Sequence, residues 1–251
     1  MHDLTILTGA SRGMGLAMAE QLCLRDAVLL CISRQRSEPL TALAQRQGTR
    51  LTQWQADLAD PTPVAERLHA WLAGQDMATC ASVTLINNAG VIGQLGPLEA
   101  CQAPDMAQTL QIDLLAPIQL TSAFLAATRG WTMPRRILNI SSGLGRRAMA
   151  GSALYCAAKA GMDHFSRCVA LDEARQRHPV RIVSLAPGVI DTDMQSALRA
   201  GDPMAFPDRD TFVRLQQTNA LASPNDAAQR VLAYLARVDF GDNVIADVRD
   251  A

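Results

Sequence analysis

The sequence predicts an α/β protein of the doubly wound class, a single domain with a mostly parallel sheet and helices on both faces. Short apolar runs alternate with longer segments of helical period, which is typical of βαβ units with right-handed crossovers. A glycine-rich turn follows the first apolar run directly, as it does where a parallel sheet binds a nucleotide. With 251 residues, 49% of them apolar and 19% charged, the chain is long enough for one large core and too apolar for disorder.

The expected elements follow in order along the chain. Strands are predicted at residues 4–8, 27–32, 83–86, 136–140, 180–185 and 243–248, where apolar runs are short, and at residues 51–55, a more polar stretch. Helices are predicted at residues 14–24, 63–72, 105–128, 153–175 and 226–235, where apolar residues recur at helical spacing. Pro117 is expected to kink the third of these helices. Ser223 and Pro224 have the residue types that begin the last one.

Residues 191–218 interrupt the alternation. Gly201-Asp202-Pro203 and Phe206-Pro207 break this stretch into pieces, so we expect a loop-rich insertion within the one domain that spans residues 1–251. Such an insertion is a candidate lid over a site. The alternative is a variable surface excursion without a role.

Composition and charge argue against several classes of protein. The net charge is −1 and no basic stripe occurs, so nucleic acid and anionic membrane are poor candidate partners. No apolar run is as long as a membrane span, and the N-terminus lacks the pattern of a signal peptide. Six cysteines are scattered without CxxC spacing or nearby histidine pairs, so we expect no metal site, no disulfide framework and a cytoplasmic location.

The glycine-rich turn, residues 8–15, reads Thr-Gly-Ala-Ser-Arg-Gly-Met-Gly. Glycines allow a tight turn and a close approach of phosphate to the backbone, and the helix that follows offers free N–H groups. Close packing also requires glycine, so a structural role is the alternative. The place of the turn, directly after the first strand, favours phosphate binding.

Tyr155 and Lys159 lie four residues apart on a predicted helix and therefore share a face. A phenol has a pKa of about 10, and moving it to about 7 requires about 4 kcal/mol. A cation about 4 Å away supplies roughly that much. Lys159 is the only lysine among 23 basic residues, which favours a role that a guanidinium does not fill over an incidental surface pair.

A hydroxyl group is placed close by in the expected fold. Ser142 follows the strand at residues 136–140, thirteen residues before Tyr155, and ligands of parallel sheets bind beyond the carboxyl ends of the strands. Ser141 qualifies equally. A serine in a turn is the simpler alternative for either residue.

These motifs, together with Asn87-Asn88-Ala89-Gly90 and the stretch Pro187-Gly188-Val189-Ile190-Asp191-Thr192, occur in the order found in classical short-chain dehydrogenases/reductases. The sequence resembles this family from Leu4 to about Val248. The resemblance implies a Rossmann-type fold and an enzyme that acts on CH–OH or C=O groups. It also implies a homodimer or homotetramer built on the helices at residues 105–128 and 153–175.

The resemblance further implies roles for single residues. Tyr155 would be the general acid, Ser142 would hydrogen-bond the substrate oxygen, and Lys159 would lower the pKa of the tyrosine and hold the nicotinamide ribose. The implied cofactor site also contains Gly9, Ser11, Arg12, Gly13, Met14, Gly15, Asp57, Leu58, Asn88, Ala89, Gly90, Pro187, Gly188, Ile190 and Thr192.

The sequence departs from the family pattern at one position. Family members usually have asparagine in the central helix, in a pattern like N-L-x-x-P, and this chain has Asp113-Leu114-Leu115-Ala116-Pro117. An ionised aspartate cannot donate a hydrogen bond, and its charge acts on Lys159. We count Asp113 among the candidate catalytic residues. Either local hydrogen bonds allow the site to tolerate the carboxylate, or turnover is slowed.

The second strand predicts the cofactor. It ends at Ser33-Arg34 without the acidic residue that would accept hydrogen bonds from a ribose 2′-hydroxyl, and Arg12 lies in the glycine turn. Two guanidiniums suit a 2′-phosphate. We therefore expect NADPH rather than NADH; the alternative is that one of these arginines is only solvated.

The substrate is less defined. Residues 186–195 and 139–142 are similar to sepiapterin reductases and to bacterial reductases of benzil-like diketones, so a small apolar or aromatic ketone or diketone is expected. The resemblance to sepiapterin reductases implies an aspartate near the C-terminus that binds a pterin. Asp247 is the candidate for it in this sequence, with Asp250 as the alternative. Leu144, Met194, Ala197, Met204 and Phe206 are candidates for the pocket wall.

The predicted function is NADPH-dependent carbonyl reduction. The first alternative is an NADP-dependent alcohol dehydrogenase that acts on a hydroxylated metabolite, because the reaction is reversible. The second is a non-catalytic nucleotide-sensing protein on the same fold, for which Asp113 would be the sign of lost catalysis.

Overall fold

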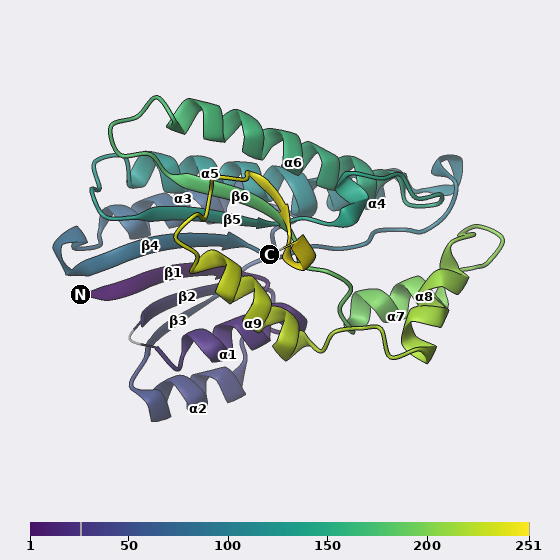
Figure 1. Ribbon diagram of the computed structural model, residues 1–251, viewed down its shortest axis with the longest axis horizontal. Coiled ribbons are helices and arrows are strands. Elements are labelled where there is room, and N and C mark those ends of the chain that lie inside the picture. Colours follow the sequence, from purple (N-terminus) through teal and green to yellow (C-terminus); the bar gives the residue numbers. More distant parts are fainter. Residues whose placement is uncertain (26, 251) are drawn as a thin grey trace.

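The computed structural model describes residues 1–25 and 27–250 and contains one seven-stranded sheet (Figure 1). Its strand order is β3-β2-β1-β4-β5-β6-β7, and every neighbouring pair is parallel. The strands are β1 (His2–Thr8), β2 (Ala27–Ser33), β3 (Arg50–Gln55), β4 (Cys80–Asn87), β5 (Arg135–Ile140), β6 (Arg181–Ala186) and β7 (Ile245–Asp247). The predicted parallel sheet and all seven strand positions are confirmed.

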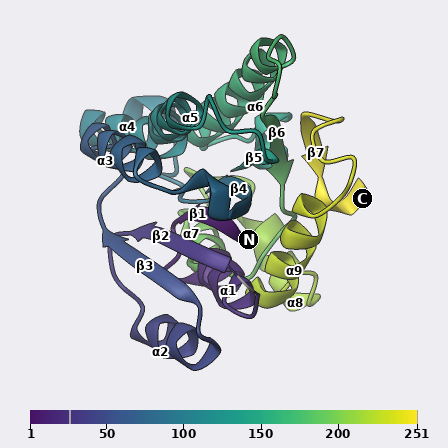
Figure 2. The same cartoon turned by 90° about the vertical axis from the view of Figure 1, so that its left-hand side faces the viewer.

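Helices cover both faces of the sheet, as Figure 2 shows. On one face α1 (Gly13–Leu22), α2 (Glu38–Gln47) and α9 (Pro224–Leu235) pack over a core that includes Met18, Leu40 and Val231. On the other face lie α3 (Thr62–Ala73), α4 (Ala103–Leu110), α5 (Ala116–Ala127) and α6 (Ala153–Glu173), over a core that includes Leu68 and Phe124. This is the predicted doubly wound architecture.

The strand order reverses between β1 and β4, because β1 is followed by β2 on one side and the chain returns to β4 on the other. Loops that leave two adjacent strands in opposite directions open a crevice at the carboxyl edge of such a sheet. The glycine turn after β1 and the Asn87-Asn88-Ala89-Gly90 segment after β4 both lie at this point. The fold therefore opens a crevice between two of the motifs identified from the sequence.

The predicted helix at residues 105–128 is continuous but irregular. A π-helical segment, Gln111–Leu115, joins α4 to α5, and Pro117 lies in the first turn of α5. By length and composition this 25-residue helix, Ala103–Ala127, could cross a membrane, a possibility the apolar runs did not show. Its residues Ile112, Leu120 and Phe124 are buried in the core beneath the sheet, as in the core helix of a globular domain.

The segment at residues 191–218 forms two helices that were not predicted, α7 (Asp193–Ala200) and α8 (Arg209–Gln217). The expectation of a loop-rich insertion was therefore wrong. Figure 1 shows both helices beside the carboxyl end of the sheet, away from the two helical layers. They pack on a separate apolar cluster around Phe206 and Phe212, whose rings stack with centroids 5.8 Å apart.

Candidate active site

The glycine turn has a backbone that only glycine adopts without strain. Gly9 and Gly13 have φ angles of 72° and 55°. A Cβ atom on Gly15 would lie 2.1 Å from the Gly9 carbonyl oxygen, and one on Gly9 would lie 2.9 Å from the Ala89 Cα. The turn is thus tight against both the start of α1 and the segment after β4.

Side-chain hydrogen bonds join this turn to the end of β4. The Thr8 hydroxyl accepts hydrogen bonds from the backbone N–H groups of Asn88 and Ala89, at 2.9 and 3.0 Å. The Asn88 side-chain amide donates to the carbonyl oxygens of Thr8 and Gly9. These bonds hold the two walls of the crevice at a fixed spacing.

A cleft of about 630 Å³ runs along the carboxyl edge of the sheet. It is lined by all the residues predicted for the cofactor: Gly9, Ser11, Arg12, Gly13, Met14, Gly15, Arg34, Asp57, Leu58, Asn88, Ala89, Gly90, Tyr155, Lys159, Pro187, Gly188, Ile190 and Thr192. Gly13, Met14 and Gly15, the first residues of α1, line it, and a helix N-terminus offers the free N–H groups that pyrophosphate binding requires. The glycine cradle that a Cβ atom would fill, and the size of the cleft, fit a nicotinamide dinucleotide.

Tyr155 and Lys159 meet in this cleft from consecutive turns of α6. The Lys159 Nζ atom lies 5.4 Å from the centre of the Tyr155 ring and donates a hydrogen bond to the Ile140 carbonyl oxygen at 3.2 Å. Both residues are buried. The i, i+4 spacing therefore produces the ammonium–phenol neighbourhood that it predicts.

Burial is the largest influence on the Tyr155 pKa and raises it. The Lys159 charge and a hydrogen bond with Ser142 lower this pKa, whereas Asp113 raises it, and the net direction is upward. The sequence-based expectation of a pKa near neutrality omitted this desolvation. Lys159 acts in the predicted direction, but in the protein alone it does not outweigh burial.

The structure separates the two candidate serines. The Ser141 hydroxyl donates to the buried Asp163 carboxylate at 2.6 Å, so Ser141 has a structural partner. The Ser142 hydroxyl accepts from the Leu144 backbone N–H at 3.2 Å, which leaves its proton for another acceptor. Ser142 is therefore the hydroxyl donor available in the cleft beside Tyr155.

Asp113 lies behind Lys159 rather than on the cleft wall. It is fully buried in the π-helical segment, and its Oδ1 atom accepts a hydrogen bond from the Val91 backbone N–H at 2.8 Å. Its Oδ2 atom is 3.4 Å from Lys159 Nζ and has no hydrogen-bond partner in the described chain. Burial raises the Asp113 pKa while Lys159 lowers it, and the net direction is upward. Asp113 acts on the site through Lys159.

The two arginines predicted for a 2′-phosphate differ in their surroundings. Arg12 forms an ion pair with Asp193 at the start of α7, and both side chains are exposed. Arg34 lines the cleft after β2, and its guanidinium makes no ion pair within the described chain. Arg34 is thus free to meet a ligand, whereas Arg12 links the glycine turn to the segment at residues 191–218.

The candidates for the pocket wall divide into two groups. Leu144 and Met194 line the cleft. Ala197 and Met204 are exposed outside it, and Phe206 is fully buried under α7 and α8, so these three expectations were wrong. Gln195, Leu198 and Phe212 line the cleft instead, at helical positions that could be identified only once α7 and α8 were known.

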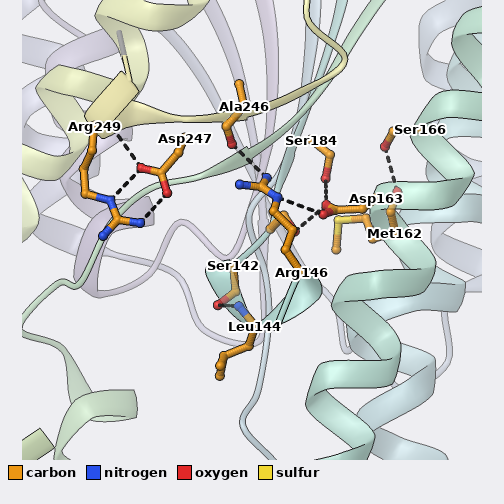
Figure 3. Close-up of polar contacts among 11 residues, drawn as sticks. Ser142, Leu144, Arg146, Met162, Asp163, Ser166, Ser184, Ala246, Asp247 and Arg249 are labelled. Atoms are coloured by element: carbon orange, nitrogen blue, oxygen red, sulfur yellow. Dashed lines mark hydrogen bonds and ion pairs between the residues drawn. The ribbon is translucent and has the colours of Figure 1, made fainter. Parts of the chain in front are cut away.

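Asp247, at the end of β7, lines the cleft and is buried, whereas Asp250 does not line it. The Asp247 carboxylate is paired with Arg249, a contact that was not predicted from the sequence (Figure 3). Asp247 Oδ1 accepts from Arg249 Nε at 2.8 Å and Oδ2 from Arg249 Nη2 at 2.5 Å. Hydrogen bonds from Arg249 hold the pKa of Asp247 below its usual value.

Comparison with known proteins shows the family of the chain. The family model described as short chain dehydrogenase matches residues 3–203. The chain is 34% identical over 235 residues to a benzil reductase ((S)-benzoin forming) of Bacillus cereus, covering 94% of each chain. It is 32% identical over 259 residues to a sepiapterin reductase of Meriones unguiculatus, covering 95% of this chain and 96% of that one.

Solved structures are similar along nearly the whole chain. A short-chain dehydrogenase/reductase from Burkholderia vietnamiensis is 35% identical, covers 99% of this chain and 98% of its own, and superposes with a TM-score of 0.65. A 3-oxoacyl-[acyl-carrier protein] reductase from Brucella melitensis in complex with NAD is 21% identical, covers 99% and 96%, and shares the fold with a TM-score of 0.80. The chain belongs to the short-chain dehydrogenase family of oxidoreductases, which use a nicotinamide cofactor to interconvert carbonyl and alcohol groups.

Proposed function

We propose that the protein is an NADPH-dependent carbonyl reductase of small apolar or aromatic ketones or diketones. The convergence of Ser142, Tyr155 and Lys159 at one end of the cleft that holds the glycine turn carries this proposal. The names of the benzil and sepiapterin reductases support a ketone as the substrate. The apolar side chains of Leu144, Met194 and Phe212 support its apolar or aromatic character.

Each residue has a defined part in the proposed reaction. The bound NADPH would supply a hydride to the carbonyl carbon. Ser142 donates a hydrogen bond to the carbonyl oxygen, and Tyr155 Oη transfers its proton to that oxygen as negative charge develops there. Lys159 stabilises the resulting phenolate. The product is the alcohol, with one hydride and one proton added across the C=O bond.

The preference for NADPH over NADH rests on Arg34. This guanidinium follows β2 and lines the cleft, and Ser33-Arg34 stands where an acidic residue would favour the 2′-hydroxyl of NADH. Arg12 lines the same cleft, and opening its pair with Asp193 would free a second guanidinium. A planar guanidinium binds phosphate through two directed hydrogen bonds.

We also propose that residues 191–218 form the lid of this cleft. Met194, Gln195, Leu198 and Phe212 reach the cleft from α7 and α8. The homodimer or homotetramer that the family resemblance implies stays a prediction. Light scattering in solution measures the number of subunits.

The test is the Tyr155→Phe variant, assayed by NADPH oxidation with benzil and with other diketones. We expect turnover to fall by at least about a hundredfold, because the general acid is removed. Tyr234→Phe is the matched control, since Tyr234 is buried to a similar extent but does not line the cleft. A Tyr155→Phe enzyme that retains the full rate contradicts the mechanism.

A further inference from the structure

Paired carboxylates line the cleft. Besides Asp57, three acidic residues line it, and each has an arginine partner: Asp191 with Arg199, Asp193 with Arg12, and Asp247 with Arg249. A carboxylate that is already paired with a guanidinium is a poor site for a further cationic ligand. The Asp247 carboxylate is likewise already paired with Arg249, and its expected contact with a pterin stays a prediction.

Two arginines that line the cleft, Arg147 and Arg249, retain unused hydrogen-bond donors. Arg249 uses Nε and Nη2 for Asp247, and its Nη1 atom has no partner within residues 1–25 and 27–250. Its side chain is 65% exposed although its carboxylate partner is 7% exposed. The guanidinium of Arg147 makes no hydrogen bond or ion pair with any described residue. These two arginines therefore present directed N–H donors and unbalanced positive charge to the cleft.

A hydrogen-bond network joins the loop that follows Ser142 to the strand that precedes Arg249 (Figure 3). Arg146, four residues after Ser142, donates to the Asp163 carboxylate at 3.2 Å and to the Ala246 carbonyl oxygen at 2.9 Å. Asp163 in turn accepts hydrogen bonds from Ser141 and Ser184, at 2.6 and 2.7 Å. The loop that carries Ser142 is thus joined directly to β7, which ends at Asp247 two residues before Arg249.

Asp247 also limits how Arg249 can move. Two side-chain bonds hold the guanidinium against the carboxylate, and a third bond, from the Arg249 backbone N–H at 2.9 Å, holds the main chain there. The remaining N–H groups of the guanidinium are therefore oriented before a ligand arrives, which reduces the entropy lost on binding. An oriented guanidinium suits a carboxylate, whose two oxygens accept parallel hydrogen bonds.

We propose that Arg249 is a substrate-recognition residue, assisted by Arg147, and that the preferred substrates are ketones that carry a carboxylate, such as aromatic 2-oxo acids. The inference rests on the proposed carbonyl reductase function and specifies its substrate class. The hydride and proton add to the ketone as before, and the product is the hydroxy acid. The carboxylate itself is unchanged by the reaction.

The test compares two substrates that share one ketone, phenylglyoxylate and its uncharged methyl ester, at saturating NADPH. We expect the wild type to have the higher kcat/KM with the acid. Arg249→Met lowers kcat/KM for the acid by about ten- to a hundredfold, chiefly through KM, and lowers it less for the ester. Fluorescence titration with NADPH measures cofactor binding in the same samples.

Arg237→Met is the matched control. Arg237 pairs with Asp239, also two residues away, through two bonds of 2.8 Å, but does not line the cleft. The double variant Asp247→Asn/Arg249→Met covers the case in which an orphaned Asp247 carboxylate unfolds the single variant. We expect the control to leave the ratio of acid to ester unchanged and the double variant to reduce it as Arg249→Met does.

The outcomes separate this proposal from the proposed function. A wild type that reduces the ester as well as the acid, or an Arg249→Met enzyme with an unchanged acid-to-ester ratio, overturns the carboxylate subsite and leaves the reductase function standing. If neither compound nor benzil is reduced, the reductase function fails. Calorimetric titration with phenylglyoxylate then decides the subsite: binding at least about tenfold tighter to the wild type than to Arg249→Met supports it, and equal binding overturns it.

Discussion

Replacing Asp113 with asparagine changes the pH dependence of the reaction. Asp113 Oδ2 lies 3.4 Å from Lys159 Nζ, and Lys159 Nζ lies 5.4 Å from the centre of the Tyr155 ring, so the carboxylate is within about 9 Å of the phenol. Asp113 raises the pKa of Tyr155, as any negative charge near a phenol does. Asparagine keeps the shape and removes the charge, so it lowers the Tyr155 pKa.

The magnitude follows from Coulomb's law. At about 9 Å and an effective dielectric constant of about 20, two unit charges interact by about 1.8 kcal/mol, or somewhat more than one pH unit. Reduction requires the protonated phenol, so activity falls as the pH rises through the Tyr155 pKa. In Asp113→Asn this alkaline limb moves to lower pH by about one unit, and the acid limb of alcohol oxidation, which requires the phenolate, moves the same way.

The assay is a pH profile of kcat/KM in both directions, with the wild type and the variant in the same buffers. Asp172→Asn is the control, because Asp172 is an exposed aspartate on α6, the helix that carries Tyr155. Superimposable profiles for the wild type and Asp113→Asn would show that the carboxylate is protonated across this range. The charge argument above would then be refuted.

Three further substitutions test single contacts. Gly15→Ala places a methyl group 2.1 Å from the Gly9 carbonyl oxygen, so we expect a loss of about 1–3 kcal/mol of stability and a raised Kd for NADPH, measured by denaturant unfolding and calorimetry. Asp193→Asn releases Arg12, which we expect to tighten NADPH about two- to fivefold and leave NADH unchanged, measured by fluorescence titration. Glu173→Gln leaves two arginines without their buried carboxylate and lowers the unfolding free energy by about 3 kcal/mol, measured with urea, with no change in cofactor affinity.

The features that could be predicted from the sequence depend on neighbours along the chain. Six of the seven strands show as apolar runs because both faces of a parallel sheet are buried, whereas the edge strand β3 is more polar and buries only Trp54. Tyr155 and Lys159 share a helix face because they are four residues apart, and Gly9 follows a strand directly. Such features need no knowledge of distant contacts.

The features that were missed depend on partners far apart in the sequence or on weak local patterns. Arg12 and Asp193 are 181 residues apart, so no local spacing could show that this arginine is paired. The helix α2 buries only Leu40 and Ala44, and its apolar stripe is too sparse to stand out, although Ser37 and Gly48 are suitable caps. The π-helical segment requires the packing around Asp113 to be known.

The Tyr155 pKa shows why residue types alone do not determine a mechanism. The sequence places a cation beside a phenol and so predicts a lowered pKa, but the structure adds the desolvation of that phenol and the Asp113 carboxylate, which act in the opposite direction. The Lys159 ammonium group interacts with both acids, since Asp113 and Tyr155 both raise its pKa against the effect of burial. A ligand that brings positive charge to Tyr155 shifts this balance toward the phenolate. The proton donor is therefore adjusted by Lys159, Asp113 and Ser142 together, and Asp113 is the one that this chain has in place of the asparagine usual in the family.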